Sequence, residues 1–148
     1  MRAVVQRVSQ ASVSTADGVV GQIGRGLAVL VGIASGDETA DIEYIASKIR
    51  ELRVFPDENG KMNRSLAEAG GQLLVVSQFT LMGDVRRGRR PAFDGAAPPD
   101  RARITFEALL ERLRAAGPVE TGVFQAHMDV ALNNDGPVTV LLDSRRTF

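Results

Sequence analysis

The stretch Leu27-Ala28-Val29-Leu30-Val31-Gly32-Ile33 is an unbroken apolar run bounded by glycines. It is too short for a buried helix, whereas a strand that is covered on both faces has this pattern. A second run, Leu73-Leu74-Val75-Val76, leads directly into Ser77-Gln78-Phe79-Thr80-Leu81. The sequence therefore predicts two buried strands, the second of which ends in a polar segment.

Helical spacing appears after each predicted buried strand. Ile42, Ile45, Ile49 and Leu52 recur at three- and four-residue intervals, and a second apolar stripe runs from Asp100, a predicted cap, to the stop at Gly117-Pro118. The prolines and glycines of residues 83 to 99 predict a long connection before this second helix, and connections of that length are usually functional or disordered.

Alternation of apolar and polar residues predicts further strands at both ends of the chain. The opening β unit covers residues 2 to 8 and 11 to 14 and, after a turn, residues 19 to 23, and the closing strands cover residues 124 to 133 and 138 to 142. We therefore expect an α/β fold with a mixed, largely antiparallel sheet and two packed helices, in the order ββ(βα)(βα)βββ, as a single domain over residues 1–148.

Composition excludes several classes of function. Lys plus Arg and Asp plus Glu number 18 each, so no strong overall field attracts nucleic acid or lipid, and any RNA contact is expected to be local. Cysteine is absent, which excludes disulfides, thiolate nucleophiles and cysteine zinc sites. No signal peptide or membrane span is recognisable, so we expect a cytoplasmic protein without a membrane partner.

Two polar segments are candidates for chemistry. Ser77-Gln78-Phe79-Thr80 offers hydroxyls, an amide and backbone N–H donors for an oxyanion, although hydroxyls at a strand end also satisfy backbone groups. Asn134-Asp135-Gly136-Pro137-Val138-Thr139 has the composition of a hairpin turn between two strands. Because glycine before proline tolerates the cis form, this segment also suits a rigid wall without a side chain.

Two weaker candidates have ordinary alternatives. His127 and Asp129, two residues apart on a predicted strand, would complete a hydrolase triad with Ser77, but no Gly-x-Ser-x-Gly elbow surrounds that serine. The loop Arg86-Arg87-Gly88-Arg89-Arg90 suits phosphate binding or is simply solvated, and Arg145-Arg146 is a possible addition. No Walker-type loop, zinc-ligand cluster or dinucleotide fingerprint is present.

Taken together, Ser-Gln-Phe-Thr-Leu at 77–81 and Asn-Asp-Gly-Pro-Val-Thr at 134–139 resemble the two signature motifs of the D-aminoacyl-tRNA deacylase family. Further matches cover nearly the whole chain: Gln6-Arg7-Val8, Gly60-Lys61-Met62-Asn63, Gly70-Gly71 and Arg90-Pro91-x-Phe93. Ala92 departs from the pattern, where a hydroxyl residue is expected.

The resemblance implies a sheet curled toward a barrel and a homodimer whose active site lies at the subunit interface. It implies hydrolysis of the ester that joins a D-amino acid, or glycine mischarged on tRNA(Ala), to tRNA. Aminoacyl-tRNA is then the partner and DNA is not, and neither a metal nor another cofactor is needed.

The resemblance also implies residue roles. Gly136 and Pro137 would form a cis-peptide wall that enters the other subunit's site and excludes L side chains, with Arg7 bracing it and Ala97 lining the pocket. Ser77, Gln78, Phe79 and Thr80 would bind the ester. Since no base adjoins Thr80 in the motif, we expect the RNA 2′-hydroxyl to assist hydrolysis, while a nucleophilic Thr80 remains open. A small-ester hydrolase with the triad and a non-enzymatic RNA-binding module are the rival interpretations.

Overall fold

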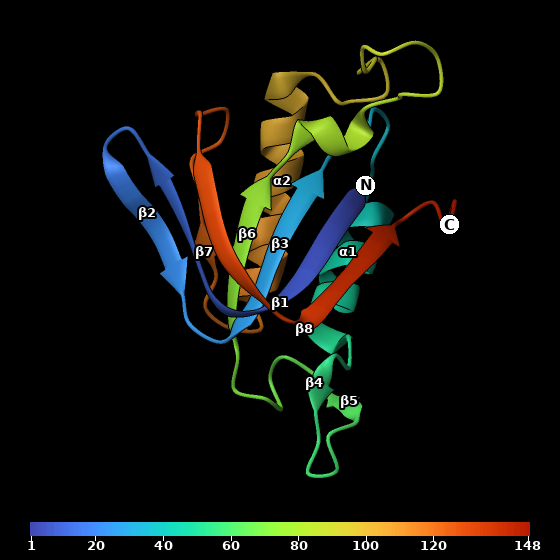
Figure 1. Ribbon diagram of the computed structural model, residues 1–148. Helices are drawn as coiled ribbons and strands as arrows, with labels where there is room; N and C mark the ends of the chain where they lie inside the picture. The colour runs from blue at the N-terminus through green and yellow to red at the C-terminus, as the bar shows by residue number, and fades with distance from the viewer.

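A curled sheet with two helices against one face makes up the computed structural model, which describes residues 1–148 (Figure 1). The sheet contains β1 (Arg2–Thr15), β2 (Gly18–Ile23), β3 (Gly26–Gly32), β6 (Gln72–Ser77), β7 (Glu120–Thr121) and β8 (Asp129–Asp143). A small hairpin pairs β4 (Phe55–Pro56) with β5 (Met62–Arg64). The helices are α1 (Thr39–Glu51), the short 3-10 helix η1 (Phe79–Met82) and α2 (Pro99–Arg114).

The strand order confirms the expected mixed, largely antiparallel sheet. It runs β2-β1-β3-β6-β7, and β8 also pairs with β1. The pairs of β1 with β2, β3 and β8 are antiparallel, whereas β3–β6 and β6–β7 are parallel. The sheet nearly closes into a barrel, since a Cβ on Gly21 of β2 would lie 2.7 Å from the carbonyl oxygen of Thr121 in β7.

Burial on both faces explains the apolar runs of β3 and β6. Leu27 and Val29 of β3 belong to the large core between the sheet and the helices, whereas Ala28 belongs to a smaller core inside the curled sheet. Leu73 and Leu74 of β6 divide between the two cores in the same way. Both runs are therefore strands because their alternate residues meet two separate apolar environments.

Each helix follows a parallel strand and returns the chain along the sheet, as the sequence predicts. Glu38 precedes α1, and its backbone N–H donates to the Asp41 carboxylate over 2.8 Å in a capping box. Pro99 is the first residue of α2. An N–H at this position has no acceptor within the helix, so proline, which lacks the N–H, costs no hydrogen bond there. Asp100, predicted as the cap, lies instead inside the first turn of α2.

The opening strands are as expected, since residues 2–8 and 11–14 lie in β1 and residues 19–23 lie in β2. Two later predictions about the strands are wrong. Residues 124–128 are not extended, because Gln125 has φ +63 and the Ala126 N–H donates to the Val123 carbonyl in a turn. The expected hairpin at 134–139 does not form, since β8 continues from Asp129 to Asp143 along β1.

A buried ion pair joins the chain start to the segment before α1. The Met1 ammonium group donates to Asp37 Oδ1 over 2.7 Å and to Ser144 Oγ over 2.8 Å. Asp37 Oδ2 accepts the Ala34 N–H over 2.7 Å, and Arg145 lies 3.6 Å from Oδ1. The side chain of Asp37 is inaccessible to solvent, so its charge is balanced by these neighbours alone.

Neither α1 nor α2 has the length and the apolar composition that a membrane-spanning helix requires.

Replacing Asp37 by asparagine tests this ion pair. Asp37→Asn leaves the buried Met1 ammonium group without its counter-charge, and loss of one partner of a buried pair costs about 3–5 kcal/mol. We expect the free energy of unfolding in urea at pH 7 to fall by that amount. Asp17→Asn, at an exposed turn, is the matched control and should change it by less than about 0.5 kcal/mol. Equal effects of the two substitutions would contradict the structural role of Asp37.

Candidate functional site

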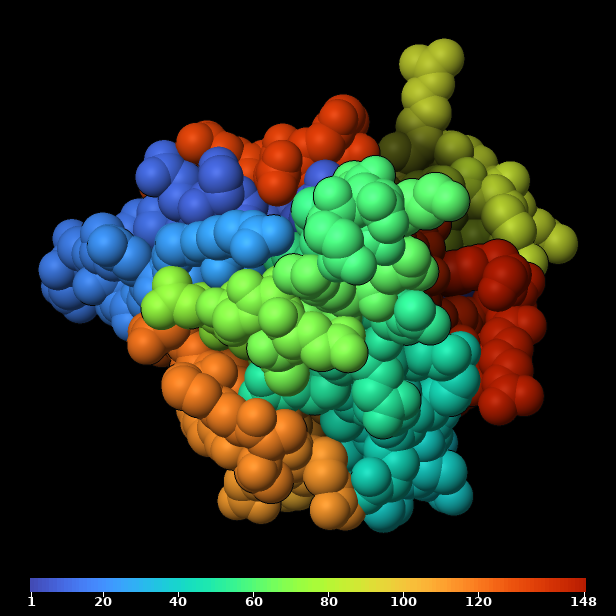
Figure 2. Space-filling view, turned by 90° about the horizontal axis from the view of Figure 1, so that it is seen from below, coloured from blue at the N-terminus to red at the C-terminus, as the bar shows by residue number.

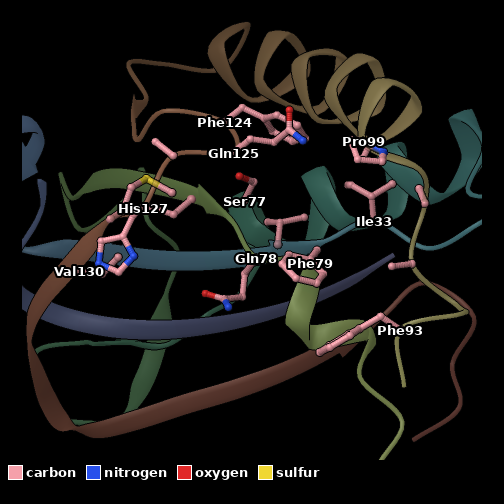
Figure 3. Close-up of a pocket in the computed structure, with 17 residues that line it drawn as sticks. Ile33, Ser77, Gln78, Phe79, Phe93, Pro99, Phe124, Gln125, His127 and Val130 are labelled. Atoms are coloured by element: carbon pink, nitrogen blue, oxygen red, sulfur yellow. The ribbon is translucent and has the colours of Figure 1, made fainter. Parts of the chain in front are cut away.

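A cavity of about 600 Å³ opens beside the carboxyl end of β6, between the sheet and the start of α2 (Figure 3). Val31, Ile33 and Val76 are among its lining residues, and the polar motif begins directly after Val76. The rest of its wall is mainly apolar: Phe79, Phe93, Ala96, Ala97, Pro99, Ala102, Phe124, Ala126, Met128 and Val130. Ser77, Gln78, Gln125 and His127 are its polar lining residues. Apolar cavities of about 300–1,000 Å³ with a few polar groups are typical of small-ligand sites.

The predicted ester-binding motif lies at the edge of this cavity. Ser77 ends β6 and points toward the Phe124–Gln125 segment, whereas the Gln78 amide points away from it (Figure 3). The Gln78 N–H donates to the Val31 carbonyl over 2.7 Å, and η1 begins at Phe79. As the first residues of that helix, Phe79 and Thr80 have no acceptor within it for their N–H groups.

Thr80 lies next to the cavity but is not part of its lining. Its hydroxyl accepts a hydrogen bond from the Gln78 side-chain amide, and no His, Lys or carboxylate group hydrogen-bonds to it. The hydroxyl therefore lacks a base that would activate it as a nucleophile.

Two aromatic residues that line the cavity, Phe93 and Phe124, are not among the predicted site residues. Phe93 packs edge-on against Phe79, with 5.0 Å between the ring centroids and 61° between the planes. Phe124 packs against Phe106 of α2 and lies 4.7 Å below the Arg103 guanidinium. The alternation of apolar and polar residues predicts a strand that includes Phe124, but this pattern does not reveal the left-handed conformation of Gln125, which interrupts the extended backbone.

His127 and Ser77 both line the cavity, but they do not form the proposed triad. No hydrogen bond joins His127 to Ser77 or to Asp129, and Figure 3 shows the imidazole and the serine hydroxyl pointing apart. The predicted strand that was to align His127 with Asp129 begins only at Asp129. No group of three or more metal-binding side chains is found in the chain.

The second motif forms a wide bulge on β8. Gln6 pairs with Thr139 and Val8 pairs with Asn134, so Asp135 to Val138 lie opposite Arg7 alone. The Gly136–Pro137 peptide bond is cis, as predicted. The Asn134 side-chain oxygen accepts the Val138 N–H over 2.8 Å and closes the bulge from within.

Arg7 holds this bulge in place. Its Nε donates to the Asp135 carbonyl over 3.1 Å and lies 3.4 Å from the Asp135 carboxylate, while Nη1 donates to the Val54 carbonyl over 2.7 Å. The Arg7 side chain is only 11% exposed, so these contacts replace most of its hydration. Gly136 and Pro137 themselves are exposed.

The structure thus divides the predicted site residues into two groups. Ser77, Gln78, Phe79 and Ala97 meet at the cavity, and Thr80 adjoins them. A second group, which consists of Arg7, Gly136 and Pro137, forms the bulge and does not line this cavity.

A family model described as D-Tyr-tRNA(Tyr) deacylase matches residues 4–143, including both motifs. The chain belongs to the D-aminoacyl-tRNA deacylase family. It is 60% identical to the D-aminoacyl-tRNA deacylase of Symbiobacterium thermophilum, with 100% of this chain and 99% of the relative aligned. It is 57% identical to that of Kosmotoga olearia over 100% of both chains. The chain is therefore an enzyme, a hydrolase of the ester bond in D-aminoacyl-tRNA.

Solved structures support the same fold. One called c-Myc DNA Unwinding Element Binding Protein is 41% identical, with a TM-score of 0.92 over 97% of this chain and 98% of that chain. A probable eukaryotic D-amino acid tRNA deacylase is 19% identical, with a TM-score of 0.81 over 95% of this chain and 97% of the other. The curled sheet with two helices is thus the fold of these relatives.

Gly136→Ala tests how firmly Arg7 holds the bulge. A Cβ on Gly136 would lie 2.9 Å from Arg7 Nη2 and 2.9 Å from Val138 Cγ2, at φ +126. Gly18 has a similar φ of +109 but nothing within 4 Å of its Cβ position, so Gly18→Ala is the matched control for backbone strain alone. We expect Gly18→Ala to lower the free energy of unfolding by about 1 kcal/mol and Gly136→Ala by about 2–3 kcal/mol. Equal losses would mean that the Arg7 and Val138 side chains both move aside without cost.

Proposed function

We propose that the enzyme reads chirality by exclusion and that its site is completed by a second copy of the chain. The terminal adenosine of tRNA enters the cavity and the aminoacyl ester lies at Ser77 to Thr80. The second copy's Gly136–Pro137 bulge then occupies the space that an L side chain needs. The observation that carries this proposal is the position of the bulge, which is exposed, firmly held by Arg7 and outside the chain's own cavity.

Apolar side chains near β8 support pairing of two copies. Val4 of β1 pairs with Leu30 on one side and Leu141 on the other, so all three project from the same face of the sheet. Leu141 is 58% exposed and Phe79, at the cavity edge, is 59% exposed. Exposed apolar surface that adjoins a site is typical of protein interfaces. A homodimer would cover both the sheet face and the cavity mouth.

Steric exclusion of the L side chain explains discrimination between D- and L-aminoacyl esters better than an added attractive contact to the D side chain. D- and L-aminoacyl esters offer the same groups, and a wall without a side chain offers no added attraction to either, so we assign discrimination to a clash with the L side chain. Glycine has no side chain to clash, and we therefore include glycyl-tRNA(Ala) among the substrates. The ester is a feature of RNA that carries an amino acid, so we expect tRNA rather than DNA as the partner, and action in the cytoplasm.

Hydrolysis needs positioning and charge stabilisation more than a protein nucleophile. Water attacks the ester carbonyl carbon, the bond from that carbon to the ribose oxygen breaks, and the ribose oxygen takes up a proton. The N–H groups of Phe79 and Thr80 would stabilise the carbonyl oxygen as it gains negative charge. The neighbouring ribose 2′-hydroxyl would orient the water, a role that fixed geometry makes effective.

A paired assay tests the proposed function. Matched D- and L-tyrosyl-tRNA are incubated with the protein, and loss of the ester is followed by acid precipitation of labelled tRNA. We expect the D ester to be hydrolysed at least about 100-fold faster in kcat/KM, a difference of about 2.7 kcal/mol in transition-state free energy. Glycyl-tRNA(Ala) should be hydrolysed as well. Equal rates for both enantiomers, or no hydrolysis of either, would refute chirality reading.

Thr80→Ala distinguishes backbone stabilisation from covalent catalysis. Because no base contacts the Thr80 hydroxyl, we expect kcat/KM for D-tyrosyl-tRNA to stay within about tenfold of the wild type. Removal of a true nucleophile costs on the order of 10⁶ in kcat, and a loss approaching that size would establish covalent catalysis instead. His127→Ala should likewise retain activity, whereas a Ser77-His127-Asp129 triad requires that it lose nearly all of it.

A further inference from the structure

The loop between η1 and α2 concentrates positive charge beside the cavity. Arg86, Arg87, Arg89 and Arg90 lie within five residues, and no acidic residue occurs between Asp84 and Asp94. The whole chain has a formal net charge of +0, so this concentration is local. The loop projects from the sheet and helices in Figure 1, and its olive segment stands out from the body of the molecule in Figure 2.

One arginine of the loop is already neutralised. The Arg86 side chain binds the Asp84 carboxylate through two contacts, of 2.6 Å and 2.9 Å. Hydrogen bonds from the Arg86 side chain and backbone, together with its charge, hold the pKa of the Asp84 carboxyl well below its usual range. This pair is an internal brace, since Asp84 also exchanges two backbone hydrogen bonds with Ala92, of 2.7 Å and 2.9 Å.

The other three arginines have no partner within the chain. Arg87, Arg89 and Arg90 are exposed and form no ion pair, although the chain forms several elsewhere. Their neighbours in the loop are Val85, Pro91 and Ala92, which offer neither an aromatic ring for base stacking nor an amide for reading base edges. Guanidinium groups in such surroundings suit phosphate oxygens, which they bind in a planar, bidentate manner.

The base of the loop is also the wall of the cavity. Phe93 contacts the Phe79 ring, and the Ala97 N–H donates to the Ile33 carbonyl over 3.0 Å. Phe93 and Ala97 both line the cavity, so the arginines are tied to one side of its mouth through a braced segment. A nucleotide strand whose last residue occupies the cavity has to leave through that mouth, where the phosphates of the preceding nucleotides meet the loop.

We infer that Arg87, Arg89 and Arg90 bind the phosphates of the tRNA acceptor end that leads into the cavity, and that they do so without reading its sequence. The inference rests on the proposed function, because it takes the terminal adenosine to lie in the cavity. The loop supplies affinity for polynucleotide, while ester positioning belongs to Ser77 to Thr80. Phosphate contacts of this kind position a nucleic acid but carry no base specificity.

Comparison of two substrates tests the inference. D-Tyrosyl-tRNA and D-tyrosyl-adenosine carry the same ester, but only the first has phosphates to bind. For the triple variant Arg87→Gln/Arg89→Gln/Arg90→Gln we expect kcat/KM on the tRNA to fall about 10- to 100-fold, mainly through KM. Hydrolysis of the adenosine ester should stay within about twofold. The slope of log kcat/KM against log salt concentration should become less negative by about 2, since each lost phosphate contact reduces the magnitude of that slope by about 0.7–0.9.

A matched control removes the same charge elsewhere. The variant Arg64→Gln/Arg112→Gln/Arg114→Gln alters arginines of β5 and of the far end of α2, two of which form exposed ion pairs that contribute little. This variant should act on both substrates as the wild type does. An equal loss in the control, or an unchanged KM in the loop variant, would overturn the inference. An equal loss of kcat/KM on the tRNA and on the adenosine ester would also overturn the inference, because the loop would then act by shaping the cavity.

Binding of uncharged tRNA separates this inference from the proposed function. We expect filter-binding assays to give a dissociation constant at least about tenfold weaker for the loop variant than for the wild type, whatever the tRNA sequence. If the wild type hydrolyses neither ester, the proposed function fails, but a weaker Kd of the loop variant still supports a phosphate-binding loop. Equal Kd values for the two proteins overturn it, even if hydrolysis occurs as proposed.

Discussion

Burial of β3 and β6 on both faces is the constraint on which the rest of the structure depends. The two parallel strands separate the large core under the helices from the smaller core inside the curled sheet. Because parallel strands need a long crossover, α1 has to connect them and lies on the outer face, and α2 follows β6 in the same manner. The carboxyl end of β6 therefore lies next to the first turn of α2, which is where the cavity opens.

The second half of the site depends on β1 rather than on the central strands. β1 pairs with β8 along nearly its whole length, and the register shifts at two places, between Gln6 and Val8, where Arg7 lies, and between Val8 and Gln10. The side chain of Arg7 then compensates for the missing ladder by binding the Asp135 and Val54 carbonyls. A nearly closed sheet thus presents a glycine and a proline at its surface, held by an arginine that comes from the opposite end of the chain.

Much of this arrangement can be predicted from the sequence, and the failures have physical causes. The apolar runs around Val29 and Val75 identify two buried strands, because they are too short for a helix that is buried on all sides. The hairpin predicted at Gly136–Pro137 does not form, because turn composition does not distinguish a chain reversal from a bulge that a distant side chain such as Arg7 supports. The strand predicted around Phe124 does not form, because Gln125 leaves the extended conformation although the alternation of apolar and polar residues continues. Residue types single out both motifs and the family resemblance relates them, whereas the cavity beside Ser77 to Thr80 is evident only in the structure.

The most direct test of the completed site is a crystal structure with an amide-linked D-tyrosyl-adenosine, which the enzyme cannot hydrolyse. We expect the adenosine in the cavity beside Phe93 and Phe124, with the amide carbonyl oxygen about 3 Å from the N–H groups of Phe79 and Thr80. Pro137 of a second copy should contact the Cα of the D-tyrosyl group. Chirality reading across two copies would be contradicted if only one copy contacts the ligand, or if Gly136–Pro137 lies far from the ligand's chiral centre.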